Sequence, residues 1–89
     1  MRDQALVGAI RRAVALLERP LTARDIADKW DARAQASFLS WMRDLLVKAE
    51  RGIDVRDECK MIGRNLDHIE SGSLYEAISA AQTACRESA

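Results

Sequence analysis

The longest stretch with helical hydrophobic periodicity runs from residue 34 to residue 50, AQASFLSWMRDLLVKAE. On a helix with about 100° between successive residues, its large apolar side chains gather within an arc of roughly 160°. An arc this wide is typical of a helix that neighbours touch on two sides. We therefore expect this segment to be the central helix of a small helical domain. The residues expected to organise its core are Phe38, Trp41 and Leu45 on this helix and Trp30 before it.

The edge of the same arc is the candidate for a surface that faces another protein. Leu39, Met42 and Leu46 are assigned to this edge. Each of these side chains could extend the apolar surface toward a partner or be covered by a helix of the same domain. For each residue taken alone, the pattern favours burial beneath another helix. Trp30 and Trp41 could likewise form a platform for stacking bases. Helical spacing favours core packing for both.

Two helices are predicted before the central one. The first begins after Asp3, a suitable N-cap, and ends before Pro20, the only proline, because proline disfavours helical geometry at the residue before it. Gly8 lies inside it and destabilises a helix by about 1 kcal/mol relative to alanine. We therefore expect another helix to approach closely there. A short helix over residues 23–30 follows, and Asp31 can cap the central helix.

Two more helices are predicted after the central one. Gly52 suits the left-handed residue that ends a helix, and Asp54 can cap the next. A single apolar stripe predicts one continuous helix over residues 54–70. Ser73 and Glu76 form a capping box that opens the last helix. The chain is thus expected to be a single all-α domain over residues 1–89, a compact bundle of about five helices.

Composition narrows the classes of function. The chain has 89 residues, of which 48% are hydrophobic and 31% charged, as in globular proteins. A formal net charge of zero argues against nucleic-acid binding as its main task. No apolar run is long enough to span a membrane, and no signal peptide is visible. Cys59 and Cys85 form no CxxC motif and are expected to be reduced core residues, so we expect a cytoplasmic chain.

The sequence offers little for catalysis. His68 is the only histidine, and nine residues separate it from Cys59, which is about 180° around a helix, so no Cys–His pair is expected. Carboxylates near helix ends suit capping better than acid–base chemistry. No glycine-rich phosphate loop and no Glu-x-x-His pair is present. We predict no catalytic, cofactor-binding or metal-binding residue and no small-molecule ligand; an all-α enzyme would need His68 in a cleft beside Asp67 or Glu70.

The order of segments resembles the C-terminal domain of the delta-prime subunit of bacterial DNA polymerase III, and the comparable domain of the related gamma/tau subunit. The segments read LVGAIRRAVALLERP, LTARDIADKWDARAQASFLSWMRDLL and CKMIGRNLDHIESGSLYEAISAAQTACRES. In that family a long helix carries a pattern of the type L-x-W-x-x-x-L-L-R-D-L-L, and an arginine lies near the end of the final helix. The counterparts here are Phe38-Leu39-Ser40-Trp41-Met42-Arg43-Asp44-Leu45-Leu46 and Arg86.

The resemblance implies a task in assembly. The family forms ring-shaped clamp loaders, in which C-terminal domains build a helical collar and ATPase-like domains open the sliding clamp. It implies a non-catalytic domain that binds other clamp-loader subunits and hydrolyses no ATP. A further helical segment usually follows the final arginine in the family, so that part of the collar packing is expected to be missing from this chain. The alternative is a free-standing helical adaptor, unrelated to replication, that dimerises through the same apolar edge.

Overall fold

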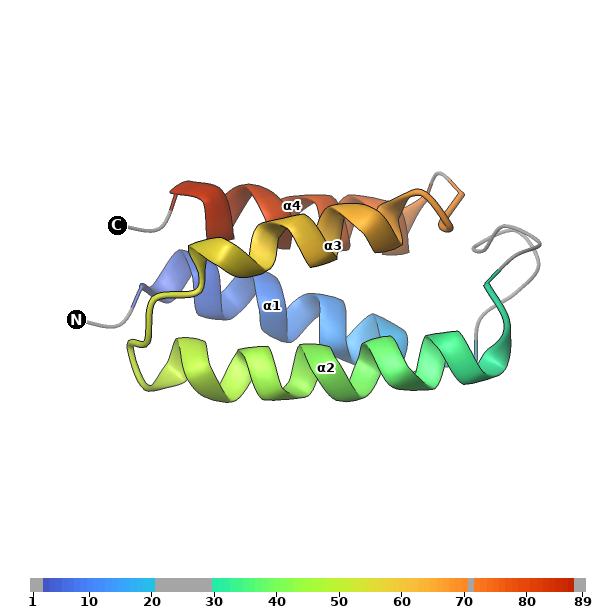
Figure 1. The fold of residues 1–89 in the computed structure, drawn as a ribbon, viewed down its shortest axis with the longest axis horizontal. Helices are drawn as coiled ribbons and strands as arrows, with labels where there is room; N and C mark the ends of the chain where they lie inside the picture. Colours follow the sequence, from blue (N-terminus) through green and yellow to red (C-terminus); the bar gives the residue numbers. More distant parts are fainter. Residues whose placement is uncertain (1–2, 21–29, 71, 88–89) are drawn as a thin grey trace.

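The computed structural model describes residues 3–20, 30–70 and 72–87, and these residues form α-helices, one 3-10 turn and no strand. The all-α prediction is therefore confirmed for the described part of the chain. Figure 1 shows α2 along one side of the molecule and α4 along the other, with α1 between them and α3 beside α4. The elements are α1 (Gln4–Leu17), α2 (Ala32–Glu50), the 3-10 helix η1 (Arg56–Glu58), α3 (Cys59–Leu66) and α4 (Ser73–Glu87).

Aspartates cap the first two helices as predicted. The Asp3 carboxylate accepts a hydrogen bond from the Leu6 amide at 3.1 Å, and the Asp31 carboxylate accepts one from the Ala34 amide at 2.8 Å. Each bond satisfies a donor that the first turn of a helix leaves without a partner. The predicted end of α1 before Pro20 is also confirmed.

The end of α2 is a Schellman motif. Gly52 adopts a φ of 75°, in the left-handed region where a side chain would be strained. The Gly52 amide donates to the Ala49 carbonyl at 3.1 Å, and the Ile53 amide donates to the Lys48 carbonyl at 3.0 Å. The prediction that Gly52 ends the central helix is confirmed, and the motif turns Ile53 back beside the last turn of α2.

The continuous helix predicted over residues 54–70 is wrong. The Asp54 carboxylate accepts a hydrogen bond from the Arg56 amide at 3.0 Å, which closes a turn before η1 and does not cap α3. α3 ends at Leu66, and the amides of His68 and Ile69 bond to carbonyls three residues back, at 3.1 Å each. Ile69 is nevertheless buried, with 6% of its surface exposed. The apolar stripe therefore marks which residues are buried, and the helix itself is shorter.

α4 begins at Ser73, so this serine lies in the first turn, and the Gly72 carbonyl accepts the Glu76 amide at 2.9 Å. The capping position is thus one residue earlier than the capping box predicted. The short helix predicted over 23–30 falls outside the described residues except for Trp30, which lies just before α2 and is not helical.

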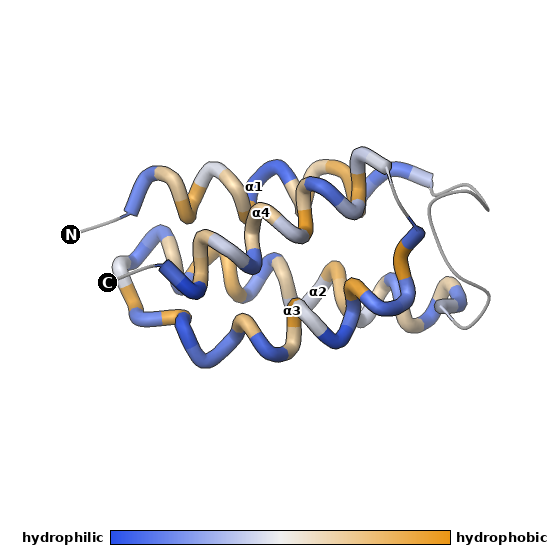
Figure 2. Tube along the Cα trace, turned by 90° about the horizontal axis from the view of Figure 1, so that it is seen from above, coloured by the Kyte–Doolittle hydropathy of each residue, from blue (hydrophilic) through white to orange (hydrophobic). Residues whose placement is uncertain are grey.

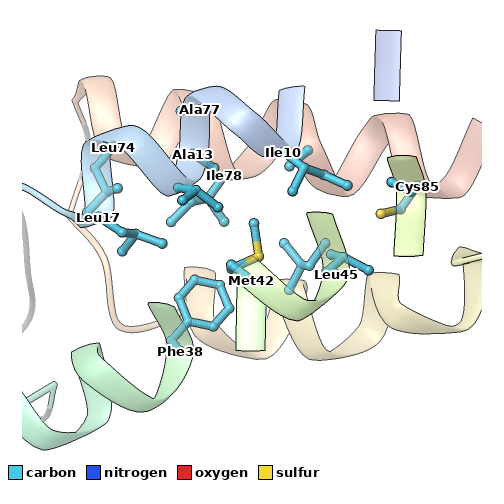
Figure 3. Packing of buried hydrophobic residues seen from close by; sticks show 14 of the residues in the cluster. Ile10, Ala13, Leu17, Phe38, Met42, Leu45, Leu74, Ala77, Ile78 and Cys85 are labelled. Atoms are coloured by element: carbon cyan, nitrogen blue, oxygen red, sulfur yellow. The ribbon is translucent and has the colours of Figure 1, made fainter. Parts of the chain in front are cut away.

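One apolar core holds the helices together, and Figure 2 shows hydrophobic positions recurring along each of them. α1 packs against α4 and α2, and α3 packs against α4. The seam between α1 and α4 contains buried small residues, which allow two helices to approach closely. Figure 3 shows Ile10 and Ile78 among the buried side chains of the core, together with Ala13 and Ala77. The seam residues are Ile10, Ala13, Ala77, Ile78 and Ala81.

The close helix approach expected at Gly8 is also wrong. A Cβ atom added at Gly8 would meet no atom within 4 Å. The tight position is Gly63, where an added Cβ would lie 2.6 Å from Nε2 of Gln82. The Gln82 amide donates to the Cys59 carbonyl at 3.3 Å, which fixes this side chain against α3. The glycine that permits a close contact therefore lies between α3 and α4.

Candidate interaction surface

The four residues predicted to organise the core lie at different depths. Phe38, Leu45 and Trp30 are buried, with 4%, 2% and 3% of their surfaces exposed, whereas Trp41 is half-buried at the edge of the core. The Phe38 ring meets Trp30 edge-on, at 5.9 Å between centroids and 64° between planes. Trp41 stacks on Phe38 at 5.9 Å and 15°. Trp41 thus covers Phe38 from the outside.

Met42 was a candidate for the partner-facing edge, with the covered position favoured, and the structure excludes the partner-facing alternative. Its side chain is fully buried at 0% exposed surface and lies near Leu45 in the core of Figure 3. Its helical position is close to that of Phe38, at the middle of the apolar arc, so it points into the domain. Leu39 and Leu46 are half-buried and lie on the flank of α2 that faces α1. The Gln35 side chain on this flank donates to a carbonyl at the end of α1 at 3.4 Å.

The opposite flank of α2 is open toward α3. α3 packs closely against α4 but not against α2, and an apolar hollow of about 310 Å³ lies between α2 and α3. We call this hollow the α2–α3 groove. Its lining consists of Ala34, Ser37, Phe38 and Trp41 from α2 and Met61 and Asn65 from α3.

Apolar side chains dominate the surface of this groove. Met61 is 41% exposed at its rim. The Asn65 side-chain amide donates to the Met61 carbonyl at 2.9 Å, so its polar group is occupied within its own helix. Beyond Trp41 lies a second hollow of about 380 Å³. Besides Trp41, this hollow is lined by Asp44, Leu45, Val47, Lys48, Arg51 and Glu58. The surface therefore combines an apolar groove with a charged end, which suits contact with another protein.

Exposed ion pairs join α2 to its neighbours on both flanks. One pair connects α2 to α1 at an N–O distance of 3.9 Å, and a second connects it to the residue after α1 at 3.5 Å. A third connects it to η1 at 3.9 Å. Exposed pairs contribute about 0.2–1 kcal/mol each. They therefore stabilise the domain only slightly. The pairs are Arg11–Glu50, Arg43–Glu18 and Lys48–Glu58.

Asp54 and Arg56 form the shortest ion pair, with 2.8 Å between Nη2 of Arg56 and Oδ2 of Asp54. Side-chain and backbone hydrogen bonds from Arg56 lower the pKa of Asp54 to about 2. The same side-chain hydrogen bond raises the pKa of Arg56. Both groups are exposed, and their charges fix the turn before η1.

The two thiols are free, and their environments differ. Cys85 is fully buried in the core, and desolvation, with smaller effects from Cys59 and Glu58, raises its pKa to about 11. Cys59 is half-buried and donates from Sγ to the Arg56 carbonyl at 2.7 Å. The prediction of a core thiol therefore holds for Cys85, whereas Cys59 lies at the edge.

The described residues contain no group of three His, Cys, Asp or Glu side chains that could hold a metal ion. Within the same part of the chain, no helix has both the length and the apolar character needed to cross a membrane.

Sequence reasoning missed Met61, the residue of α3 that borders the groove. Its position on the polar side of the apolar stripe was the available signal, because a methionine there has no place in the core of the domain. Comparison of the chain with protein-family models, with curated proteins and with solved structures found no match.

Proposed function

We propose that this chain is a non-catalytic helical domain that binds a partner protein through the α2–α3 groove. The observation that carries the proposal is the apolar groove itself, with Met61 41% exposed on one wall and a half-buried Trp41 on the other. Tryptophan and methionine are enriched at protein interfaces. Removing apolar surface from water contributes about 25 cal/mol per Å², so a partner side chain in this groove would gain binding energy.

The partner class we propose is another subunit of a bacterial clamp loader, with the domain acting in the cytoplasm as part of the collar. This assignment rests on the resemblance over residues 6–86. The structure adds one supporting detail, because Trp41 of the family-like segment borders the groove. Arg43 and Leu46 of the same segment instead lie on the flank of α2 that faces α1, where Arg43 forms an ion pair with Glu18. A free-standing adaptor would use the same groove for an unrelated partner.

The experiment is a calorimetric titration of this chain with purified C-terminal domains of the other clamp-loader subunits. Met61→Asp places a charge in the apolar groove, and we expect it to weaken binding by about 30-fold, as for a hot-spot residue. Tyr75→Asp is the matched control, because Tyr75 is 39% exposed on α4 and does not line the groove. We expect this control to bind like the wild type.

Two results would contradict the proposal in different ways. No complex at tens of micromolar protein would reject the clamp-loader assignment. A complex that Met61→Asp and Tyr75→Asp weaken equally would reject the groove as the binding surface. Binding that depends on Met61 but involves only a protein unrelated to replication would favour the adaptor.

A further inference from the structure

We propose that the outer face of α2, near its C-terminal end, is a self-association surface on which the α2 helix of a second copy of this chain packs antiparallel. The proposal rests on the juxtaposition of an exposed valine and two opposite charges on one helix face, with an exposed isoleucine just beyond the end of the helix. This face points away from the core. The surface includes Asp44, Val47 and Arg51 from the hollow beyond Trp41 but no residue that lines the α2–α3 groove, so the proposal does not rest on the partner assigned to that groove.

The apolar part of the surface consists of Val47 and Ile53, which are 46% and 48% exposed. The hydrogen bond from the Ile53 amide to the Lys48 carbonyl, at 3.0 Å, folds the chain back at the end of α2. In a Schellman motif this fold commonly brings the residue after the glycine against the last helical turns. Val47 directly precedes Lys48, so both exposed apolar residues lie at this end of α2.

Two opposite charges flank Val47 on the same face. Asp44 lies three residues before it and Arg51 four residues after it, and both are exposed. Seven residues span about 10.5 Å along a helix. Neither Asp44 nor Arg51 makes an ion pair with a described residue, whereas the neighbouring Lys48 pairs with Glu58. The face therefore offers one negative and one positive group at equal distances from a point between residues 47 and 48.

This arrangement is complementary to itself. A two-fold axis between residues 47 and 48 would place Asp44 opposite Arg51 of the second copy, and Arg51 opposite Asp44 of the second copy. The same axis would bring Val47 beside its own counterpart. Reciprocal contacts of this kind are what a symmetric dimer interface requires. A second copy is thus the one partner certain to carry the matching charges in the matching order.

The surface is small, so the dimer should be weak and depend on protein concentration. Stable interfaces bury about 1,200–2,000 Å², and one helix face with two large apolar side chains provides less. The exposed charge pairs should also make the dimer weaker at high salt.

The test is sedimentation velocity over a range of concentrations of the whole chain. Asp44→Arg or Arg51→Asp alone places like charges opposite each other at both ends of the interface, and we expect about tenfold weaker dimerisation or more. The double variant Asp44→Arg/Arg51→Asp restores opposite charges, and we expect dimerisation to return. Arg64→Asp, on an exposed position of α3, is the control and should dimerise like the wild type.

A wild-type chain that remains monomeric at about millimolar concentration would overturn the proposal. So would a dimer that the single reversals leave unchanged, or one that the double reversal fails to restore. Circular dichroism of each variant checks that the helices remain folded. Met61→Asp should dimerise normally, so failure of groove binding and failure of self-association are distinguishable.

Discussion

The α1–α4 pair and the α2–α3 pair differ in what lies between the helices. α1 and α4 pack closely, with buried Ala13, Ala77 and Ala81 in their seam. α2 and α3 are separated by larger side chains, with Phe38 and Trp41 on the α2 side, and a groove remains. Small side chains allow helices to approach, whereas large ones fill only part of the space between them. We infer that the first pair supplies stability and the second supplies a binding surface.

The largest expected effect is on the α1–α4 side. Ile78 is fully buried, and Ile78→Ala removes apolar contacts and leaves a cavity. We expect a loss of about 2–5 kcal/mol in the free energy of unfolding. Urea denaturation followed by circular dichroism measures this loss. If Ile78→Ala lowered the free energy of unfolding by less than Trp41→Ala does, the claim that the α1–α4 pair supplies the stability would be contradicted.

Trp41→Ala should cost less stability despite the larger side chain removed. Trp41 is only half-buried and covers Phe38 from outside the core. We expect about 1–2 kcal/mol lower stability, together with loss of partner binding. Urea denaturation measures the loss of stability, and the calorimetric titration measures the loss of partner binding. Unchanged partner binding would show that the indole is structural only.

Alanine substitutions at two helical glycines sharpen the comparison. Gly8→Ala should raise stability by about 0.5–1 kcal/mol, because its Cβ meets no atom within 4 Å and glycine is unfavourable in a helix. Gly63→Ala should gain less or nothing. Its Cβ must displace Gln82, whose hydrogen bond to the Cys59 carbonyl would be lost. Equal gains at both positions, measured by thermal unfolding, would show that α3 and α4 are not in tight contact there.

The smallest expected effect concerns pH. The pKa of Asp54 is about 2 in the folded chain, against an ordinary value of 3.8, because Arg56 hydrogen-bonds its charged form. A lowered folded-state pKa adds stability at pH values above about 4, and this stability is lost as the pH falls toward 2. Carboxyl NMR titration measures the pKa directly, and Arg56→Gln should return it toward 3.8. An ordinary pKa in the wild type would show that the ion pair does not persist in solution.

Much of the helical framework follows from local sequence. Asp3, Asp31 and Gly52 mark the ends of α1 and α2 because capping depends on side-chain chemistry within a few residues. The predicted helix over 54–70 failed because its apolar stripe continues to Ile69 after the helix has ended. The Asn65 side chain bonds a carbonyl within α3, and i to i+3 hydrogen bonds close its last turn.

The groove could not be predicted, because it depends on how far apart two helices lie. A helical wheel orders the side chains of α2 around its axis but does not say where neighbouring helices cover them. Met42 was therefore kept as a candidate for the partner-facing edge although it is fully buried. Trp41 was assigned to the core although it borders the groove. Met61 stands out on the polar side of its apolar stripe, but only the structure places it across the groove from Trp41.

The most direct test is an NMR titration of the isotopically labelled chain with a clamp-loader C-terminal domain. The account predicts that the Trp41 indole N–H and Met61 methyl signals shift together, while Tyr75 and Ala80 on the α1–α4 side keep their positions. Signals that shift at Tyr75 and Ala80 but not at Trp41 and Met61 would place binding on the wrong face. Such a result would contradict the claim that the α2–α3 groove is the binding surface.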